Sequence, residues 1–148
     1  MRVYVASSWR NGLQSLVVEA LRTDGHEVYD FKNPPSANSV FRWMDIDPTW
    51  KSWTGDNLRA ALSHPVAEAG FKSDWDAMQW AEVGVLLLPC GRSAHLEAGY
   101  FVGAGKPLYV LLATENEPEL MYKMATGICV SVGELCDALD VAAGAVQP

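Results

Sequence analysis

Residues 83–100 read VGVLLLPCGRSAHLEAGY and hold the pattern that decides the fold. The run Val83–Leu88 is continuously apolar and ends at Pro89, which is typical of a buried central strand in a parallel sheet. Ser93 is a residue type that caps helices, so we expect a helix over about 94–104. The stretch therefore predicts a strand, a loop and a helix in succession.

Similar patterns on both sides of this stretch predict four further strands separated by helices. The predicted strands are 3–6, 26–31, 108–112 and 128–132, and the further predicted helices are 13–21, 57–62, 65–81 and 133–141. This alternation predicts an α/β, flavodoxin-like (Rossmann-like) fold, with a five-stranded parallel sheet of order 2-1-3-4-5 and helices on both faces. At 148 residues the chain is expected to form a single domain.

In this topology, ligands bind beyond the carboxyl ends of the first and third strands, where the winding of the sheet reverses. Those ends lead into Ser7–Gly12 and Pro89–Glu97. We therefore expect the functional residues in these two segments.

Composition narrows the choice of partner. The formal net charge of −7 disfavours a nucleic-acid polymer, because an acidic surface repels phosphate backbones. Neither a bilayer-spanning apolar run nor a signal-peptide pattern is present, so no membrane partner is expected. Cys90, Cys129 and Cys136 lack close pairing, which predicts reduced thiols and a cytoplasmic protein. A small-molecule partner remains.

Several sharper motifs are absent. The first turn lacks the glycine pattern of a dinucleotide site, and Gly105-Lys106-Pro107 lacks the rest of a Walker loop. His95-Leu96-Glu97 matches part of a deaminase motif, but the chain has no C-x-x-C. The histidines and cysteines have no metal-ligand spacing. We therefore expect neither a metal ion nor a cofactor.

Glu97 is the candidate nucleophile. With Ser93 as the helix cap, Glu97 lies in the first turns of its helix, where the helix dipole favours an ionised carboxylate. A positioned carboxylate can attack an anomeric carbon, as in retaining glycosidases. The alternative is a glutamate that only stabilises its helix.

Asp74 is the candidate second carboxylate. It precedes Val83 by nine residues on the predicted helix, so its side chain is expected near the rim of the sheet rather than its floor. There it could protonate a leaving base or position a sugar. The alternative is an ordinary surface carboxylate.

A phosphate site is predicted where the first strand passes into the first helix. Hydroxyls, guanidinium groups and helix N–H groups can bind one phosphate there and so select a nucleotide. The side chains that offer these groups are Ser7, Ser8, Arg10, Arg92 and Ser93. The alternative is that Ser8 or Asn11 caps the helix and that Arg10 is solvated.

The segment 32–56 has no regular periodicity and carries Phe41, Trp43, Trp50 and Trp53. A connection this long within a compact domain is often a lid or binding loop. Its aromatic side chains could stack on a base, or they could pack the loop onto its own domain. We expect at least one of them to contact the substrate, with Trp43 as the candidate.

The order and spacing of several short motifs add a further argument. They are residues 3–10 (VYVASSWR), Asp74 with 81–83 (AEV), 97–100 (EAGY) and 105–107 (GKP). Together they resemble the nucleoside 2-deoxyribosyltransferase family, including the deoxynucleoside 5′-monophosphate N-glycosidases, over roughly residues 1–112 apart from 32–56. The resemblance implies a flavodoxin-like enzyme that cleaves or transfers the N-glycosidic bond of a nucleoside or nucleoside 5′-monophosphate.

The resemblance also implies roles for individual residues. Glu97 falls on the glutamate that forms a covalent glycosyl-enzyme intermediate, and Asp74 falls on the family's catalytic aspartate. Tyr4 falls on an aromatic position near the sugar, and residues 8–12 are most similar to the monophosphate hydrolases. With the residues already discussed, the predicted substrate-binding set is Tyr4, Ser7, Ser8, Trp9, Arg10, Gly12, Trp43, Arg92 and Ser93.

The sequence departs from the family at two positions. Glu82 stands where an aspartate is usual, and His95 is not typical two residues before the catalytic glutamate. Family members are homo-oligomers, dimers or larger, whose sites borrow residues from a neighbouring subunit. Residues 119–122 (ELMY) are the candidate for such a contribution.

Other functions stay open at this stage, and each has a distinguishing observation. A TIR-like NAD glycohydrolase would release nicotinamide from NAD. A non-catalytic nucleotide sensor would bind its ligand without releasing free base, and an interaction module would bind no nucleotide. Sequence does not distinguish hydrolysis from transfer, nor ribose from deoxyribose.

Overall fold

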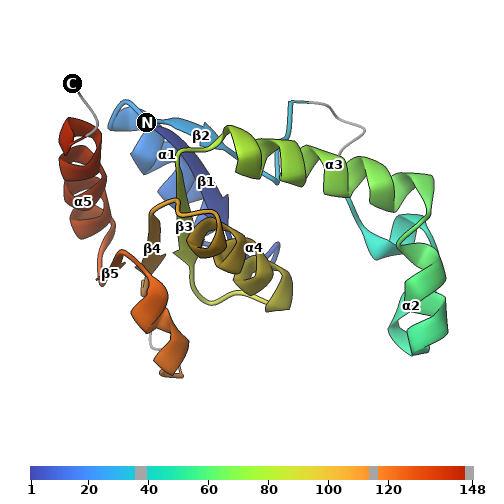
Figure 1. The fold of residues 1–148 in the computed structure, drawn as a ribbon. Helices are drawn as coiled ribbons and strands as arrows, with labels where there is room; N and C mark the ends of the chain where they lie inside the picture. Colours follow the sequence, from blue (N-terminus) through green and yellow to red (C-terminus); the bar gives the residue numbers. More distant parts are fainter. Residues whose placement is uncertain (36–39, 114–116, 146–148) are drawn as a thin grey trace. The chain divides into compact units, whose positions relative to one another are not determined.

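The computed structural model describes residues 1–35, 40–113 and 117–145. Within them, five parallel strands form one sheet in the order β2-β1-β3-β4-β5, which confirms the predicted fold class (Figure 1). The strands are β1 (Arg2–Ala6), β2 (Glu27–Tyr29), β3 (Val83–Leu87), β4 (Leu108–Leu111) and β5 (Gly127–Cys129). The helices are α1 (Gln14–Thr23), α2 (Gly55–Ala61), α3 (Pro65–Trp80), α4 (Arg92–Gly103) and α5 (Val132–Ala145), with short 3-10 helices η2 (Trp43–Asp45), η3 (Trp50–Ser52) and η4 (Leu120–Met124).

Packing divides the chain into two compact units. The first contains residues 1–30 and the described residues from Met78 onward, and the second contains the described part of 31–77. The first unit carries the whole sheet with α1, α4 and α5. The predicted loop 32–56 falls in the second unit, where residues 36–39 lie outside the described chain. That the two units form a single domain stays a prediction.

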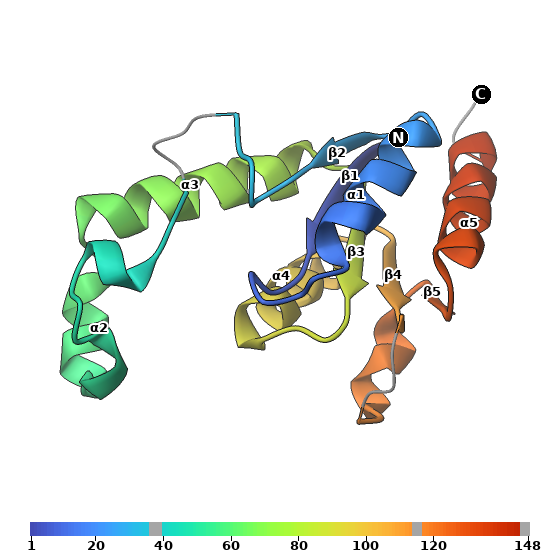
Figure 2. The same cartoon turned by 180° about the vertical axis from the view of Figure 1, so that it is seen from behind.

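Helices cover both faces of the sheet in the first unit. Figure 1 shows α4 against one face, and Figure 2, from behind, shows α1 against the other. The main apolar core lies between the sheet and the pair α1 and α5, where Leu21, Leu135 and Leu139 are fully buried against the strands. Burial of these side chains removes apolar surface from water and is the main force that holds the layers together.

On the opposite face, a glycine in β3 allows α4 to approach the sheet closely. A Cβ atom at Gly84 would lie 2.6 Å from Cγ of Phe101, whose side chain is fully buried. The Phe101 ring also contacts Tyr4 at a centroid distance of 5.8 Å. This contact fixes how α4, and with it Glu97, sits over the sheet.

The last strand ends earlier than predicted, because the chain is turned into α5 by side-chain hydrogen bonds. Val130 N–H donates to Glu134 Oε2 at 2.8 Å, and Glu134 N–H donates to Ser131 Oγ at 3.2 Å. Ser131 and Glu134, three residues apart, thus bind the backbone at the helix start in a pattern related to the capping box, with Glu134 accepting from the residue before Ser131. Val132, predicted as strand, is therefore the first residue of α5.

Lys106 fastens the end of α3 to the chain that enters β4. Its ammonium donates hydrogen bonds to the carbonyl oxygens of Met78, Gln79 and Ala81, at 2.9, 2.8 and 2.6 Å. A cation at a helix C-terminus satisfies carbonyl groups that have no partner within the helix.

Among the helices of the described chain, none has the length and apolar character needed to cross a bilayer.

Candidate active site

Two side-chain hydrogen bonds join the loops that follow β1 and β3. Ser7 Oγ donates to the carbonyl oxygen of Leu87 at 3.0 Å, and Asn11 Nδ2 donates to that of Pro89 at 3.2 Å. Asn11 is 4% exposed, and its Oδ1 accepts from Leu13 N–H at 2.9 Å. At the predicted binding edge, the segment after β1 is therefore held against the end of β3 and the loop that follows it by hydrogen bonds.

The turn after β1 presents the predicted phosphate-binding residues. Ser8 Oγ accepts from Arg10 N–H at 3.2 Å, and the Ser8 carbonyl accepts from Asn11 N–H at 2.9 Å. Trp9, Arg10 and Gly12 are exposed, whereas Ser8 is half-buried. The residue at the N-cap of α1 is Leu13, which makes no side-chain cap. Asn11 is the residue of this turn whose side chain is engaged at the helix start, where it accepts from Leu13 N–H, and Arg10 is exposed to solvent.

The helix that carries Glu97 begins two residues earlier than predicted. Its N-cap is Gly91, which offers no side-chain hydrogen bond, and Ser93 lies within the first turn. The prediction that Ser93 caps this helix is therefore wrong; a glycine also serves at N-caps, and the chain is already helical at Arg92. Arg92 and Ser93 are exposed at the helix N-terminus, on the same edge as the β1–α1 turn.

Because of this shift, Glu97 lies in the second turn of α4. The helix dipole acts mainly within the first turn, so it favours an ionised Glu97 less than the sequence suggested. Glu97 is half-buried and borders the face of α4 that packs on the sheet, where Ala94, Ala98 and Phe101 are buried. The backbone of α4 thus holds this carboxylate at the rim of the packed layer.

The thiol of Cys90, in the loop after β3, is influenced by the negative charge of Glu97. Burial, followed by the negative charge of Glu97, raises the pKa of Cys90 to about 11. At neutral pH the thiol is therefore protonated, and a protonated thiol is a weak nucleophile. Cys90 is therefore poorly suited to attack, which leaves Glu97 as the candidate nucleophile.

His95 connects α4 to η4. Its Nδ1 lies 2.9 Å from the Gly91 carbonyl oxygen, and its Nε2 lies 3.1 Å from the Tyr122 hydroxyl. The two rings stack with centroids 6.0 Å apart. They border a largely apolar cavity of about 200 Å³ between α4, β4 and η4, which is lined by Leu86, His95, Ala98, Gly99, Val102, Leu108, Val110, Glu119, Met121, Tyr122, Met124 and Ala125.

This cavity is smaller than typical small-molecule sites, which enclose roughly 300–1,000 Å³. Glu97 is not among its lining residues, all of which belong to the described chain. Glu97 and several lining residues of the cavity thus belong to the same helix, α4, but Glu97 does not face the cavity. His95 and Tyr122 mark its boundary.

Sequence reasoning missed a buried polar pair at the same edge of the sheet. Gln14 is fully buried, and its Nε2 donates to Asp30 Oδ1 at 2.8 Å, where Asp30 directly follows β2. Gln14 stands three residues before Val17 on the buried face of α1, so a polar residue in an apolar stripe was the available signal. The pair adds a carboxylate to the first unit near the predicted site.

The remaining predicted residues lie elsewhere. Tyr4 is 1% exposed, and its ring stacks on Tyr29 with centroids 5.5 Å apart. In the second unit, Asp74 is half-buried on α3, and Trp43 makes edge contacts with Phe41 and Trp53 at 4.6 and 5.4 Å. Trp43 thus packs within its own unit, and the substrate roles of these residues stay predictions.

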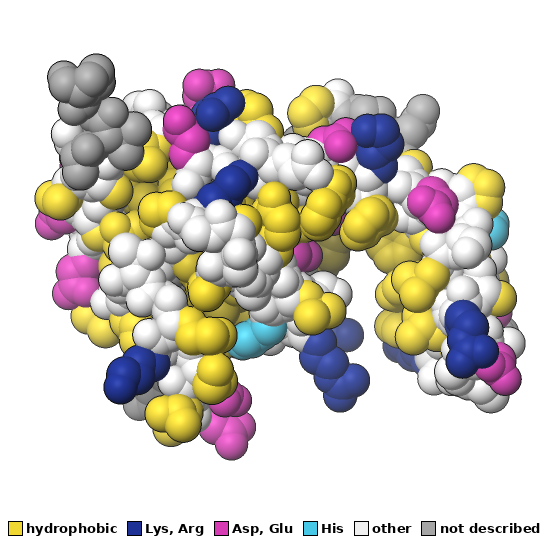
Figure 3. All heavy atoms as spheres, in the orientation of Figure 1, with side chains coloured by type: hydrophobic (Ala, Val, Ile, Leu, Met, Phe, Trp, Pro, Cys, Tyr) yellow, Lys and Arg dark blue, Asp and Glu magenta, His cyan; other side chains and the backbone are white. Residues whose placement is uncertain are grey.

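A hydrophobic surface covers η4, which carries residues of the predicted subunit contribution. Figure 3 shows hydrophobic side chains gathered over this segment. Leu120, Met121 and Met124 are 82%, 59% and 52% exposed. Large apolar side chains exposed together often mark a contact surface.

The fold and this edge define a flavodoxin-like α/β protein with a carboxylate at its switch point. No family model matches the sequence, and no curated protein matches it significantly. A 2-deoxyribosyltransferase from the psychrotolerant bacterium Bacillus psychrosaccharolyticus has a similar structure, with a TM-score of 0.65 and 16% identity, over 93% of this chain and 91% of that one. The CMP N-glycosidase BcmB of Clostridium botulinum is also similar, with a TM-score of 0.51 and 18% identity, over 95% of this chain and 99% of that one. These likenesses show the fold.

Proposed function

We propose that this chain is an enzyme that cleaves or transfers the N-glycosidic bond of a nucleoside or nucleoside 5′-monophosphate through Glu97. The observation that carries the proposal is the position of Glu97, half-buried on α4 at the carboxyl end of β3. Two structures with the same fold are a deoxyribosyltransferase and a CMP N-glycosidase, which supports this class of reaction. Fold alone does not decide function, so the argument rests on the site.

In the proposed reaction, Glu97 attacks the anomeric carbon of the sugar while the bond to the base breaks. The departing base takes up a proton, a role that the sequence resemblance implies for Asp74, and the sugar stays covalently bound to the Glu97 carboxylate. Water then releases the sugar in a hydrolase, and a second base takes it in a transferase. A neighbouring protonated thiol, Cys90, does not compete with Glu97 as nucleophile.

We further propose that the 5′-phosphate of a nucleotide binds between the β1–α1 turn and the first turn of α4. Arg10 and Arg92 are exposed there and can neutralise the phosphate charge. The first N–H groups of α4 receive no side-chain cap from Gly91, so they remain suited to an anion. Trp9, Ser8 and Ser93 complete the substrate contacts in this proposal, which favours nucleotides over nucleosides.

The proposal is tested by incubating the purified protein with a panel of nucleosides, 5′-monophosphates and NAD, and measuring free base by chromatography. We expect base release by wild type and a loss of at least about a thousandfold in Glu97→Ala, because the covalent route is removed. Glu19→Ala, an exposed glutamate of α1, is the matched control and should keep wild-type rates.

Other outcomes would point to different functions. Base release that survives Glu97→Ala removes Glu97 from the mechanism. Nicotinamide release from NAD alone would indicate a TIR-like glycohydrolase. Tight nucleotide binding without free base, unchanged in Glu97→Gln, would indicate a sensor.

A further inference from the structure

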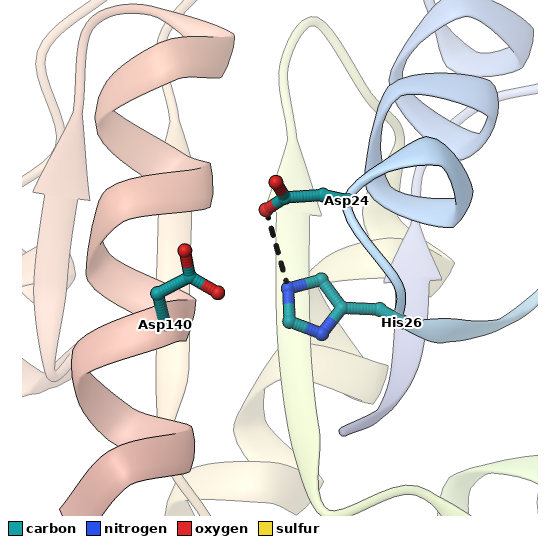
Figure 4. Close-up of side chains that lie close together, drawn as sticks. All are labelled: Asp24, His26 and Asp140. Carbon is teal, nitrogen blue, oxygen red and sulfur yellow. Dashed lines mark ion pairs between the residues drawn. The ribbon is translucent and has the colours of Figure 1, made fainter.

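Three side chains converge at the amino edge of the sheet, opposite the candidate active site. Asp24 follows α1, His26 precedes β2, and Asp140 lies on α5. One ligand atom from each lies within 4.8 Å of the others. Figure 4 shows the Asp24 carboxylate joined to the His26 ring by an ion pair, with the Asp140 carboxylate facing them from α5.

His26 is buried with one ring nitrogen unsatisfied. Its side chain is 3% exposed, and Nδ1 lies 3.2 Å from the amino nitrogen of Met1. Nε2 has no hydrogen-bond partner among the residues that the structure describes. Asp24 Oδ2 is the nearby oxygen, at 3.6 Å, which is beyond hydrogen-bond range. Buried polar groups are almost always satisfied, so this nitrogen calls for a partner.

The chemistry of the three groups suits a divalent transition-metal ion. The neutral imidazole is the form that binds metals. One imidazole and two carboxylates form a mixed nitrogen and oxygen donor set, whereas magnesium and calcium prefer oxygen donors alone.

We propose that Asp24, His26 and Asp140 form a binding site for a divalent transition-metal ion, with zinc as its representative. His26 Nε2 and one oxygen from each carboxylate are the ligands, and water completes the coordination. The ring hydrogen then resides on Nδ1, on the side of the ring that faces Met1. The ion would join α1, β2 and α5 and act structurally, because the proposed reaction lies at the opposite edge.

This proposal departs from the expectation of no metal, which rested on histidine and cysteine spacing. The ligands at positions 24 and 140 are carboxylates from opposite ends of the chain, and folding alone brings them together. Spacing in the sequence therefore carried no signal for this site.

The test uses tag-free protein that begins at Met1, stripped with a chelator and titrated with zinc chloride by calorimetry. We expect one equivalent to bind and to raise the melting temperature, since an ion that binds only the folded state stabilises it. Asp140→Asn should weaken binding by at least about tenfold, because loss of even an outer-shell partner has an effect of that size. Asp137→Asn, an exposed aspartate on the same helix, is the matched control and should bind as wild type does.

His26→Gln provides a second variant, with its fold checked by circular dichroism. If it unfolds, Asp140→Asn decides the question, because Asp140 is exposed and its loss does not open the core. The proposal is overturned if wild type binds no zinc at unit stoichiometry. It is also overturned if Asp140→Asn binds zinc as tightly as wild type, which would place the ion elsewhere.

Discussion

The hydroxyl of Tyr122 donates a hydrogen bond to Nε2 of His95 at 3.1 Å. The direction follows from the other ring nitrogen, because Nδ1 faces the Gly91 carbonyl oxygen at 2.9 Å and a carbonyl can only accept. A neutral imidazole with its hydrogen on Nδ1 has its lone pair on Nε2. The pair therefore connects η4 to the helix that carries Glu97.

This relationship predicts energetic coupling between the two side chains. We expect Tyr122→Phe and His95→Ala each to lower the free energy of unfolding, with a coupling of about 0.5–1.5 kcal/mol, the usual net value of one hydrogen bond. Urea unfolding of both single variants and the double variant measures it. Strictly additive effects would mean that the hydrogen bond contributes nothing in solution.

Lys106 gives a second prediction about stability. Replacing it with methionine keeps most of the apolar stem but leaves the carbonyl groups of Met78, Gln79 and Ala81 without the ammonium. We expect a loss of about 1–3 kcal/mol in urea unfolding, because hydrogen bonds to a charged donor are among the stronger ones. Lys123→Met, at an exposed lysine of η4, is the control, and an equal loss there would contradict the assigned role.

Sequence periodicity sufficed for most of the sheet, because β3 and β4 are apolar runs, β1 is apolar after Arg2, and α1 has an apolar stripe. The alternation of these elements leaves few topologies, since parallel crossovers are right-handed and neighbours in sequence tend to be neighbours in space. The strand order and the helices on both faces were predictable for this reason. The same strand order predicted that Ser7 and Cys90, which follow β1 and β3, lie at the carboxyl edge of the sheet.

The details of the site were less predictable, because they depend on single contacts. Serine is a common N-cap residue, which made Ser93 the expected cap. The helix nevertheless begins at Arg92, because Gly91 can also serve as its N-cap. The link from Gln14 to Asp30 joins residues from different elements, and no local pattern indicates which partner a buried amide will take. Long-range polar pairs of this kind are decided only when the elements pack.

Glu82 predicts a pH dependence of stability. The Arg2 backbone N–H, which donates to Glu82 Oε2 at 2.8 Å, is the main cause that lowers the pKa of Glu82. A carboxyl whose pKa is lower in the folded than in the unfolded state stabilises the fold above the unfolded pKa of 4.5, and this contribution is lost as the pH falls through the folded value. Glu82→Gln should therefore be less stable than wild type at pH 7, and the difference should disappear once the pH lies below the lowered folded pKa of Glu82.

The difference at pH 7 should not exceed about 1 kcal/mol, because the Glu82 and Arg2 side chains are partly exposed and solvent screens them. Chemical unfolding at a series of pH values measures it. Glu19→Gln serves as the control on an exposed helix position. A difference that is constant with pH would rule out the Glu82 charge as its source.

The exposed apolar residues of η4 predict self-association. If residues 119–122 contact a second copy, as the sequence resemblance implies, Leu120→Asp should shift the protein to a smaller species, because a charge would be buried at the interface. Sedimentation velocity of wild type and variant makes the comparison. Leu16→Asp, an exposed leucine of α1, is the control. A monomeric wild type would contradict the expectation at once.

Asn11 links stability to the proposed reaction, because one buried amide fastens the turn after β1 to the loop that leads to Glu97. Asn11→Ala leaves the Leu13 N–H and the Pro89 carbonyl without this partner, so we expect a loss of about 1–3 kcal/mol in unfolding. The rate of base release should also fall, even under conditions where the variant is fully folded, since a misplacement of about 1 Å at a reacting centre can reduce the rate about a hundredfold. Ser15→Ala removes only a 3.4 Å contact to Gln14 in the same region and should leave both nearly unchanged. Measured at a temperature where both variants are folded, a wild-type rate in Asn11→Ala would show that this link holds the fold without positioning the site.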